Sequence, residues 1–339
     1  MSSTTPQYTE TADTAHLVTS KKVWTTLITN TNYLSGLLSL DYSLKKVHSK
    51  YPLIALYTDT FPPEGHHALD IRGIPKKRIN YMLPSQHKDY SNDPRFYDCW
   101  SKLAPFSLVE YDRVVQLDSD MFVRKNMDEL MDLELDPPEM EGRGNKVFAA
   151  SHACVCNPRK KKHYPKDWYV VPCARSIVPS SEANTSRFRI PENCGFTALH
   201  SDPDYAQTHG ASAKTSLGMP NGGLQVINPS LAIYERINAQ LTQDVSTYEF
   251  ADQSMLSELF FDRWVTLPYV YNALKTLRWE GVHDAIWRDE EVKNVHMLLS
   301  PKAWDEKPGD ASDETHKWWH VLNAKRLEEE KARGLEDGF

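Results

Sequence analysis

The stretch Arg113-Val114-Val115-Gln116-Leu117-Asp118-Ser119-Asp120 joins a short apolar run to two acidic residues. Its first half predicts a buried strand over residues 113–117, and its second half predicts a loop that leaves the sheet. In extended chain, residues i and i+2 point to the same side, so Asp118 and Asp120 would lie close together. Two such carboxylates repel each other unless a cation lies between them, and oxygen ligands suit Mg²⁺ or Mn²⁺. The stretch therefore predicts a strand with a metal site at its end.

Two other interpretations of this acidic pair exist. It could be a plain surface loop, because a lone D-x-D is common. It could also be a calcium loop, since Glu129 is the twelfth residue counted from Asp118. Phe122 and Val123, however, occupy the positions where such a loop needs an oxygen ligand and a turn glycine. The calcium loop is therefore excluded, and the surface loop stays open.

Strand-like and helix-like segments alternate on both sides of this stretch. Apolar runs predict strands over residues 23–28, 53–57, 79–83, 224–227 and 292–296, and helical spacing predicts helices over about 34–47, 97–108, 249–261 and 313–333. This alternation indicates an α/β fold with a mostly parallel sheet covered by helices. Ligands of open α/β sheets bind beyond the carboxyl ends of the strands. The residues that follow the first strand and the Asp118–Asp120 loop are thus predicted to face one crevice.

The organisation expected for the 339 residues is a disordered leader over 1–20, one large domain over 21–310 and a C-terminal helix over 311–339. Residues from about 151 to 217 are rich in Pro, Cys, Lys, Ser and His with weak periodicity, which predicts a long insertion such as a lid or acceptor-binding region. The net charge of −7 argues against nucleic acid as a partner. No apolar stretch approaches the roughly 18 residues of a membrane helix, and the polar first 20 residues lack the apolar core of a secretory signal. We therefore expect no membrane partner and a cytoplasmic location.

Four of the five cysteines fall within this insertion: Cys154, Cys156, Cys173 and Cys194. In a reducing compartment they are expected to be thiols. A structural zinc site is conceivable, but the spacing is not the paired C-x-x-C pattern of most such sites. Zinc binding stays an open question on sequence grounds.

Several later residues carry weaker signals. His296 follows an apolar strand, and an imidazole can join carboxylates around Mn²⁺, with Lys302 close enough in sequence to serve the same phosphates. Asn221-Gly222-Gly223 precedes a strand, where glycines let the backbone approach a ligand. Asp252-Gln253 opens a predicted helix. Taken singly, His296 is better explained as a structural histidine and Asn221-Gly222-Gly223 as a plain turn, and Asp252 can be a helix cap.

The order of these motifs resembles glycosyltransferase family 8, which includes glycogenin and galactinol synthase. The motifs, spread over residues 23–305, are Thr26-Leu27-Ile28-Thr29-Asn30-Thr31-Asn32-Tyr33, Lys102, Asp118-Ser119-Asp120, Asn221-Gly222-Gly223, Asp252-Gln253, Tyr271-Asn272, and His296 with Lys302 and Trp304. The resemblance implies a Rossmann-like nucleotide-diphospho-sugar transferase (GT-A type) fold, a single domain with a long insertion. It also implies a UDP-sugar donor and Mn²⁺ or Mg²⁺ as cofactor.

The resemblance further assigns roles to single residues. Asp118, Asp120 and His296 would bind the metal. Donor-binding residues would be Leu27, Thr29, Asn30, Tyr33, Lys102, Ser119, Asn221, Gly222 and Gly223, while Gln253, Asp252 and Lys302 would act in catalysis. Transfer would retain the anomeric configuration. Because an amide is a poor nucleophile, Gln253 favours a front-face path in which the metal and lysines neutralise the leaving UDP.

Departures from the family pattern narrow the expected function. The position of glycogenin's acceptor tyrosine is Trp279, which has no hydroxyl, and the Leu277-Arg278-Trp279 segment is similar to galactinol synthase. The family's glycine and proline near the late histidine are Leu299 and Ala303. We therefore expect a hexosyltransferase that uses a small hydroxylated acceptor, with galactose transfer to myo-inositol as one example.

Two alternatives stay open: a self-glucosylating primer enzyme that uses another tyrosine, and an inactive UDP-sugar-binding protein. A sugar-1-phosphate nucleotidyltransferase is disfavoured because Thr29-Asn30-Thr31-Asn32 stands where that class has a Gly-rich basic loop. The sequence leaves the donor sugar, the acceptor and the oligomeric state open, including a homodimer.

Overall fold

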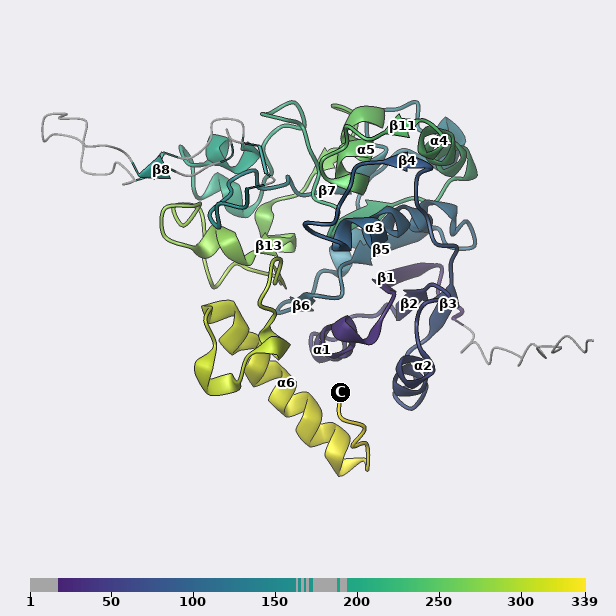
Figure 1. The fold of residues 1–339 in the computed structure, drawn as a ribbon, viewed down its shortest axis with the longest axis vertical. Coiled ribbons are helices and arrows are strands. Elements are labelled where there is room, and N and C mark those ends of the chain that lie inside the picture. The colour runs from purple at the N-terminus through teal and green to yellow at the C-terminus, as the bar shows by residue number, and fades with distance from the viewer. Residues whose placement is uncertain (1–17, 163, 166–167, 169–170, 173–187, 190–193) are drawn as a thin grey trace, which may run out of the picture.

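The computed structural model describes residues 18–162, 164–165, 168, 171–172, 188–189 and 194–339. Its centre is a seven-stranded sheet with the strand order β12-β7-β10-β5-β1-β2-β3 (Figure 1). These strands are β1 (Lys22–Ile28), β2 (Leu53–Tyr57), β3 (Lys76–Arg78), β5 (Arg113–Leu117), β7 (Phe148–Ala150), β10 (Leu224–Ile227) and β12 (Val265–Thr266). β5, β1, β2 and β3 run parallel, whereas β10 is antiparallel to both β5 and β7. The predicted mostly parallel sheet is confirmed.

Helices cover both faces of this sheet. They are α1 (Leu34–Lys46), α2 (Pro63–Asp70), α3 (Arg95–Cys99), α4 (Leu231–Leu241), α5 (Ala251–Leu259) and α6 (Glu314–Ala332). Because strand residues alternate between faces, Val23 and Val114 pack with residues of the 3-10 helix Trp100–Ser107, α4 and α5. Trp24 and Val115 point the other way, toward α1. The sheet is thus the middle of three layers.

A small second sheet places the late histidine beside the acidic loop. It consists of β13 (Ala273–Leu274), β14 (Asn294–His296) and β6 (Met121–Val123), in that order. β14 is antiparallel to β6, and His296 pairs with Met121. Since β6 begins directly after Asp120, this pairing brings two residues that are far apart in sequence to the end of β5.

Backbone hydrogen bonds join the two ends of the segment between β7 and β10, and we call this paired region the neck. The Ala153 N–H donates to the Met219 carbonyl (2.9 Å), and the Asn221 N–H donates to the Ser151 carbonyl (2.8 Å). Within the described part of this segment lie β8 (Val171–Pro172), β9 (Phe188–Arg189) and the 3-10 helices Gly195–Leu199 and Tyr205–Gln207. It projects from the upper left of the sheet in Figure 1.

The C-terminal helix α6 packs back on the domain. Asp313 caps it by accepting from the Thr315 N–H, and Tyr42 of α1 donates to Glu329 (2.9 Å). Arg72 and Arg326, both almost fully buried, each lie 2.8 Å from Glu330. In the described part of the chain, none of the helices has the length and apolar character needed to cross a bilayer.

Three predicted boundaries differ from the structure. The strand predicted over 79–83 is wrong: β3 lies at Lys76–Arg78, and Ile79 and Met82 instead enter the core from irregular chain. The helix predicted over 97–108 is α3 followed by a 3-10 helix, which contains Pro105 and so lacks one N–H donor. Most of the leader predicted over 1–20 lies outside the described residues, but Val18 already packs against the core.

Candidate active site

A cavity of about 390 Å³ lies at the carboxyl edge of β1 and β5. Thirteen of the residues singled out from sequence line it: Leu27, Thr29, Asn30, Tyr33, Lys102, Asp118, Ser119, Asp120, Asn221, Gly223, Asp252, Gln253 and His296. Gly222 and Lys302 do not line it but lie directly behind residues that do. The two groups expected to face one crevice therefore share this cavity.

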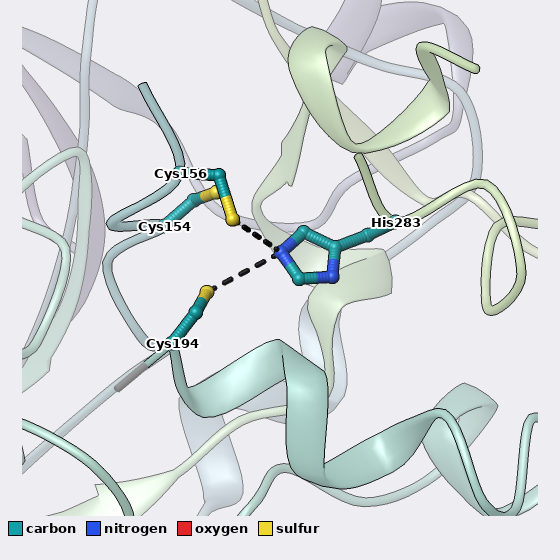
Figure 2. A group of neighbouring side chains, drawn as sticks. All are labelled: Cys154, Cys156, Cys194 and His283. Carbon is teal, nitrogen blue, oxygen red and sulfur yellow. Dashed lines mark hydrogen bonds between the residues drawn. The ribbon is translucent and has the colours of Figure 1, made fainter. Parts of the chain in front are cut away.

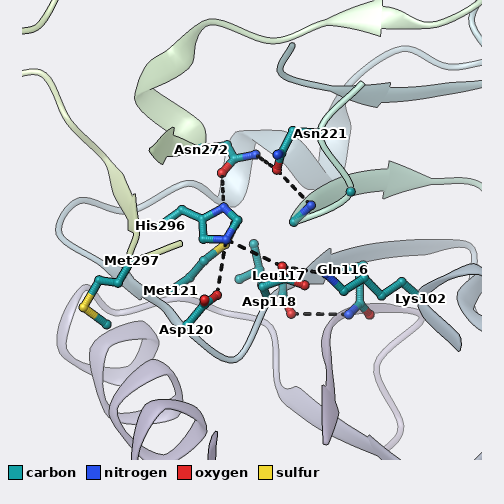
Figure 3. A network of polar contacts seen from close by, with 12 residues as sticks. Lys102, Gln116, Leu117, Asp118, Asp120, Met121, Asn221, Asn272, His296 and Met297 are labelled. Carbon is teal, nitrogen blue, oxygen red and sulfur yellow. Dashed lines mark hydrogen bonds and ion pairs between the residues drawn. The ribbon is translucent and has the colours of Figure 1, made fainter. Parts of the chain in front are cut away.

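Asp118, Asp120 and His296 meet at the floor of the cavity. The nitrogen Nε2 of His296 lies 3.3 Å from Oδ1 of Asp120 and 3.6 Å from Oδ2 of Asp118 (Figure 3). Backbone bonds hold the loop, because the Asp118 N–H donates to the Gly223 carbonyl (2.8 Å) and the Met297 N–H donates to the Asp120 carbonyl (2.9 Å). One ligand atom from each of the three side chains lies within 4.8 Å of the other two. The arrangement is more ordered than a plain surface loop.

A chain of amides fixes the orientation of the His296 ring. Asn272 donates through Nδ2 to Oδ1 of Asn221 (2.8 Å), so its own Oδ1 faces Nδ1 of His296 (2.9 Å) and accepts a hydrogen bond from it. In the neutral form of the ring, the form that can bind a metal ion, the proton would be on Nδ1 and the Nε2 lone pair would face the space shared with the two carboxylates. Three electron-pair donors converge on one point, and a divalent cation suits this donor set.

Two lysines neutralise the carboxylates. Lys102 donates to Asp118 (2.7 Å), and Lys302 donates both to Asp120 and to the Met297 carbonyl. Burial acts to raise the pKa of Asp120, but the Lys302 ammonium and His296 outweigh it and hold that pKa well below its usual range. Burial acts to lower the pKa of Lys102, yet Asp118 keeps it well above its usual range. The floor of the cavity thus holds ionised groups of both signs.

The two glycines of the Asn221-Gly222-Gly223 motif permit close approach. A Cβ on Gly222 would lie 2.0 Å from Oδ2 of Asp252, and one on Gly223 would lie 2.5 Å from the His296 ring. Oε1 of Gln253 accepts from the Gly222 N–H (2.9 Å). No side chain larger than hydrogen fits at either position without moving these groups.

Asp252 is a buried carboxyl rather than a helix cap. The residue before α5 is Phe250, and Asp252 lies within the first turn with 2% of its surface exposed. Its Oδ2 has no hydrogen-bond partner among the described residues. Burial raises the pKa of Asp252 to about 7, although Lys102 acts to lower it. The cavity therefore holds an acceptor that is free for a ligand.

The part of the cavity that follows β1 is polar and aromatic. Thr29 donates to Asp98 (2.8 Å), and Asn30 donates to Thr29 (3.1 Å). The ring of Tyr33 contacts Trp304 edge-on at 5.7 Å, and burial raises the pKa of Tyr33 to about 12. This part offers hydrogen-bonding groups and a ring face, which suit a base and a sugar.

Sequence reasoning missed several lining residues. Arg95, Asp98 and Cys99 line the cavity together with Lys102. Their spacing of i, i+3, i+4 and i+7 is that of one helix face, so the helical pattern around Lys102 already indicated that these residues lie on the same side as Lys102. Phe250 and Trp168, whose rings stack at 4.8 Å, also line the cavity.

Two residues that depart from the family pattern, Trp279 and Leu299, differ in their position relative to the cavity. Trp279 is not among the lining residues, and its Nε1 donates to Asp313 (2.6 Å) at the start of α6. Leu299 lines the cavity with φ of +65°, the left-handed conformation that favours glycine. The backbone shape expected of a glycine is kept there although the residue is leucine.

Comparison with known proteins gives consistent relatives. Residues 25–169 match the profile of the family described as Glycosyl transferase family 8. Galactinol synthase 1 of Solanum lycopersicum is 28% identical over 320 residues, covering 91% of this chain and 84% of that protein. Galactinol synthase 2 of Arabidopsis thaliana is 25% identical over 317 residues, covering 91% of this chain and 83% of that protein.

Solved structures share the fold. The glycosyltransferase GlyE of Streptococcus pneumoniae TIGR4 aligns with a TM-score of 0.52 at 16% identity, covering 93% of this chain and 65% of that one. The galactosyltransferase LgtC, solved with donor and acceptor sugar analogues, aligns with a TM-score of 0.51 at 17% identity, covering 89% and 95%. The fold is therefore the GT-A type, as the sequence predicted.

Proposed function

We propose that this chain belongs to glycosyltransferase family 8, whose profile matches residues 25–169, and that it transfers a hexose from a UDP-sugar to a small hydroxylated acceptor with Mn²⁺ or Mg²⁺ as cofactor. One observation carries the proposal: Asp118, Asp120 and His296 converge in a cavity that is also lined by the polar and aromatic residues that follow β1, which suit a nucleoside. The names of the galactinol synthases and of the LgtC complex support a sugar donor and a separate acceptor.

The donor is proposed to lie along the cavity. Thr29, Asn30 and Tyr33 would hold uracil and ribose, and Leu27 would pack beside them. Asp118, Asp120 and His296 would hold the metal ion, which when bound stabilises negative charge on the diphosphate. Lys102 and Lys302 already lie against the two carboxylates. With a metal ion held by these carboxylates, the two ammonium groups would be available to stabilise charge on the leaving UDP.

The sugar would lie between Asp252, Gln253 and Asn221. The free Oδ2 of Asp252 is suited to accept from a sugar hydroxyl. Oε1 of Gln253 already accepts from two donors, the Gly222 N–H and the Asn221 amide. An amide oxygen engaged in this way is a weak nucleophile, which favours front-face transfer with retention. LgtC has also been solved as an active-site variant with glutamine replaced by glutamate, which fits a role for a glutamine in this family's sites.

The structural position of Trp279 disfavours self-priming at that residue, since its indole N–H is bonded to Asp313 outside the cavity. The alternative of an inactive UDP-sugar-binding protein rests on Leu299, because a leucine side chain lies where the family has a glycine. Its left-handed backbone, however, keeps the course that a glycine would give the chain.

The test begins with thermal shifts in Mn²⁺ with UDP-glucose, UDP-galactose and UDP-N-acetylglucosamine. The best donor is then assayed for transfer to myo-inositol and other polyols, and the intact mass of the protein is followed in the same reaction. We expect acceptor-dependent product, no added mass and loss of turnover in chelator. Mass additions of hexose would instead favour a primer enzyme.

Asp118→Asn and Asp120→Asn separate the metal site from general damage. Both are expected to abolish transfer, and Asp120→Asn should also lower the free energy of unfolding, because it leaves the buried Lys302 ammonium without its carboxylate partner. Asp112→Asn, an exposed carboxylate before β5, is the matched control and should keep full activity. Full Mn²⁺-dependent activity of Asp120→Asn would show that the metal assignment is wrong.

A further inference from the structure

A second group of metal-ligating side chains lies beside the cavity. It consists of Cys154, Cys156, Cys194 and His283, and one ligand atom from each lies within 4.8 Å of all the others. In Figure 2 the sulfur atoms turn toward the imidazole ring from two separate chain segments. The three cysteines are free thiols, and His283 is completely buried. Such a gathering of thiols around one buried imidazole needs a physical reason.

The spacing of these atoms suits a tetrahedral ion. Nε2 of His283 lies 3.3 Å from Sγ of Cys156 and 3.3 Å from Sγ of Cys194. Bonds of about 2.3 Å from zinc to sulfur and about 2.0 Å from zinc to nitrogen place such atoms roughly 3.5 Å apart in a tetrahedron. These two distances would need to change by only a few tenths of an ångström to bind such an ion.

The orientation of His283 has its own support. Nδ1 of His283 lies 2.8 Å from Nε2 of His200, which is placed to accept its proton. Nε2 of His283 is then left with its lone pair directed at the thiols. Zinc-binding histidines are held in this way by a hydrogen bond from the other ring nitrogen.

We propose that Cys154, Cys156, Cys194 and His283 bind one structural Zn²⁺ ion. Thiolate and imidazole ligands select zinc over Mg²⁺ or Mn²⁺, and four protein ligands leave no open position for a substrate. Sequence reasoning grouped the three cysteines with Cys173, which lies outside the described residues, and it missed His283, which is 89 residues beyond Cys194. The fourth ligand is thus supplied from outside the insertion.

The ion would tie the insertion to the rest of the domain. Cys154 and Cys156 follow β7, Cys194 precedes the 3-10 helix Gly195–Leu199, and His283 belongs to the chain between β13 and β14. Cys154 also lines the active-site cavity. One ion would therefore hold the cavity wall made by the insertion against the chain that carries His296.

The first experiment measures zinc in the full-length protein purified without chelator. We expect roughly one zinc ion per chain, released when a mercurial reagent titrates the thiols and detected with a metallochromic dye. Replacement by Co²⁺ is expected to give the intense visible bands and sulfur-to-metal charge transfer of a tetrahedral thiolate site. Protein that contains no zinc after growth in zinc-supplemented medium and gives no such cobalt spectrum would overturn the proposal.

Variants then locate the ion. Cys194→Ser and His283→Ala should lose most of the zinc, whereas Cys99→Ser, a thiol outside the group, should keep it. Asp120→Asn should also keep it, which separates this ion from the proposed catalytic metal and makes the test independent of transferase activity. If Cys194→Ser does not fold, the cobalt spectrum of the wild-type protein still shows whether a tetrahedral thiolate site is present. Equal zinc contents in Cys194→Ser and the wild type, or loss in Asp120→Asn, would contradict the assignment.

Discussion

Replacing Asp252 by asparagine should stabilise this protein, and the gain should grow with pH. Asp252 is buried, and burial raises its pKa from the ordinary 3.8 to about 7. The folded protein therefore retains this proton at pH values where the unfolded chain has lost it. The stability that comes from the protonated carboxyl is fully present below pH 3.8 and is lost as the pH rises through 7.

The size of the effect follows from the two pKa values. At about 1.36 kcal/mol per pH unit, the gap corresponds to a loss of about 4 kcal/mol that is complete above the folded-state pKa. Asparagine has the shape of the protonated acid and no charge. Asp252→Asn should thus be more stable than the wild type by about 2 kcal/mol at pH 5 and by about 4 kcal/mol at pH 8.

Urea unfolding of both proteins at pH 5 and pH 8, in chelator so that no metal ion contributes, measures this difference. Asp112→Asn is the control, because an exposed carboxylate should change the free energy of unfolding by less than about 0.5 kcal/mol at either pH. A stability gain for Asp252→Asn that is the same at both pH values would refute the reasoning, since it would show that Asp252 is ionised throughout the range.

Three further outcomes follow from the site. Asn272→Ala removes the acceptor that orients His296, and we expect Mn²⁺ affinity, read from the metal dependence of UDP-sugar turnover, to fall about 10- to 100-fold; unchanged affinity would show that the ring needs no such support. Gly222→Ala places a methyl group 2.0 Å from Oδ2 of the buried Asp252 and should lower the free energy of unfolding, measured by urea titration, by about 1–3 kcal/mol; an unchanged free energy would show that the carboxyl can move aside. Trp279→Phe loses one hydrogen bond, worth about 1 kcal/mol, but should keep acceptor-dependent transfer; abolished turnover would contradict its position outside the cavity.

Local patterns predicted the elements nearest the sheet. β1, β2, β5 and β10 were predicted because each is a short apolar run that is buried on both faces. β3 was missed for the opposite reason: Lys76–Arg78 is a cationic edge strand whose formation depends on pairing with β2 rather than on its own composition.

The residues of the candidate site likewise divide into those that the sequence predicted and those that it did not. The acidic loop could be recognised from its position after a strand, and His296 from the order of the family motifs. The amide chain through Asn221 and Asn272 could not, because it depends on how two loops meet in space. His283 gave no local signal, since nothing in its neighbours marks it as a partner of Cys194. A candidate ligand that is distant in sequence and belongs to no recognised motif, such as His283, becomes visible only once the chain is folded.

The paired neck between β7 and β10 has a consequence for how such proteins diverge. Both ends of the insertion leave the sheet at one place, where Ala153 and Asn221 are bonded to Met219 and Ser151. Mutations that lengthen, shorten or recombine the chain beyond this neck leave the strands beneath it in register. A lineage can therefore change the cavity wall made by the insertion while inheriting the edge that carries the acidic pair, so that, under the proposed function, the acceptor would change without a new donor site.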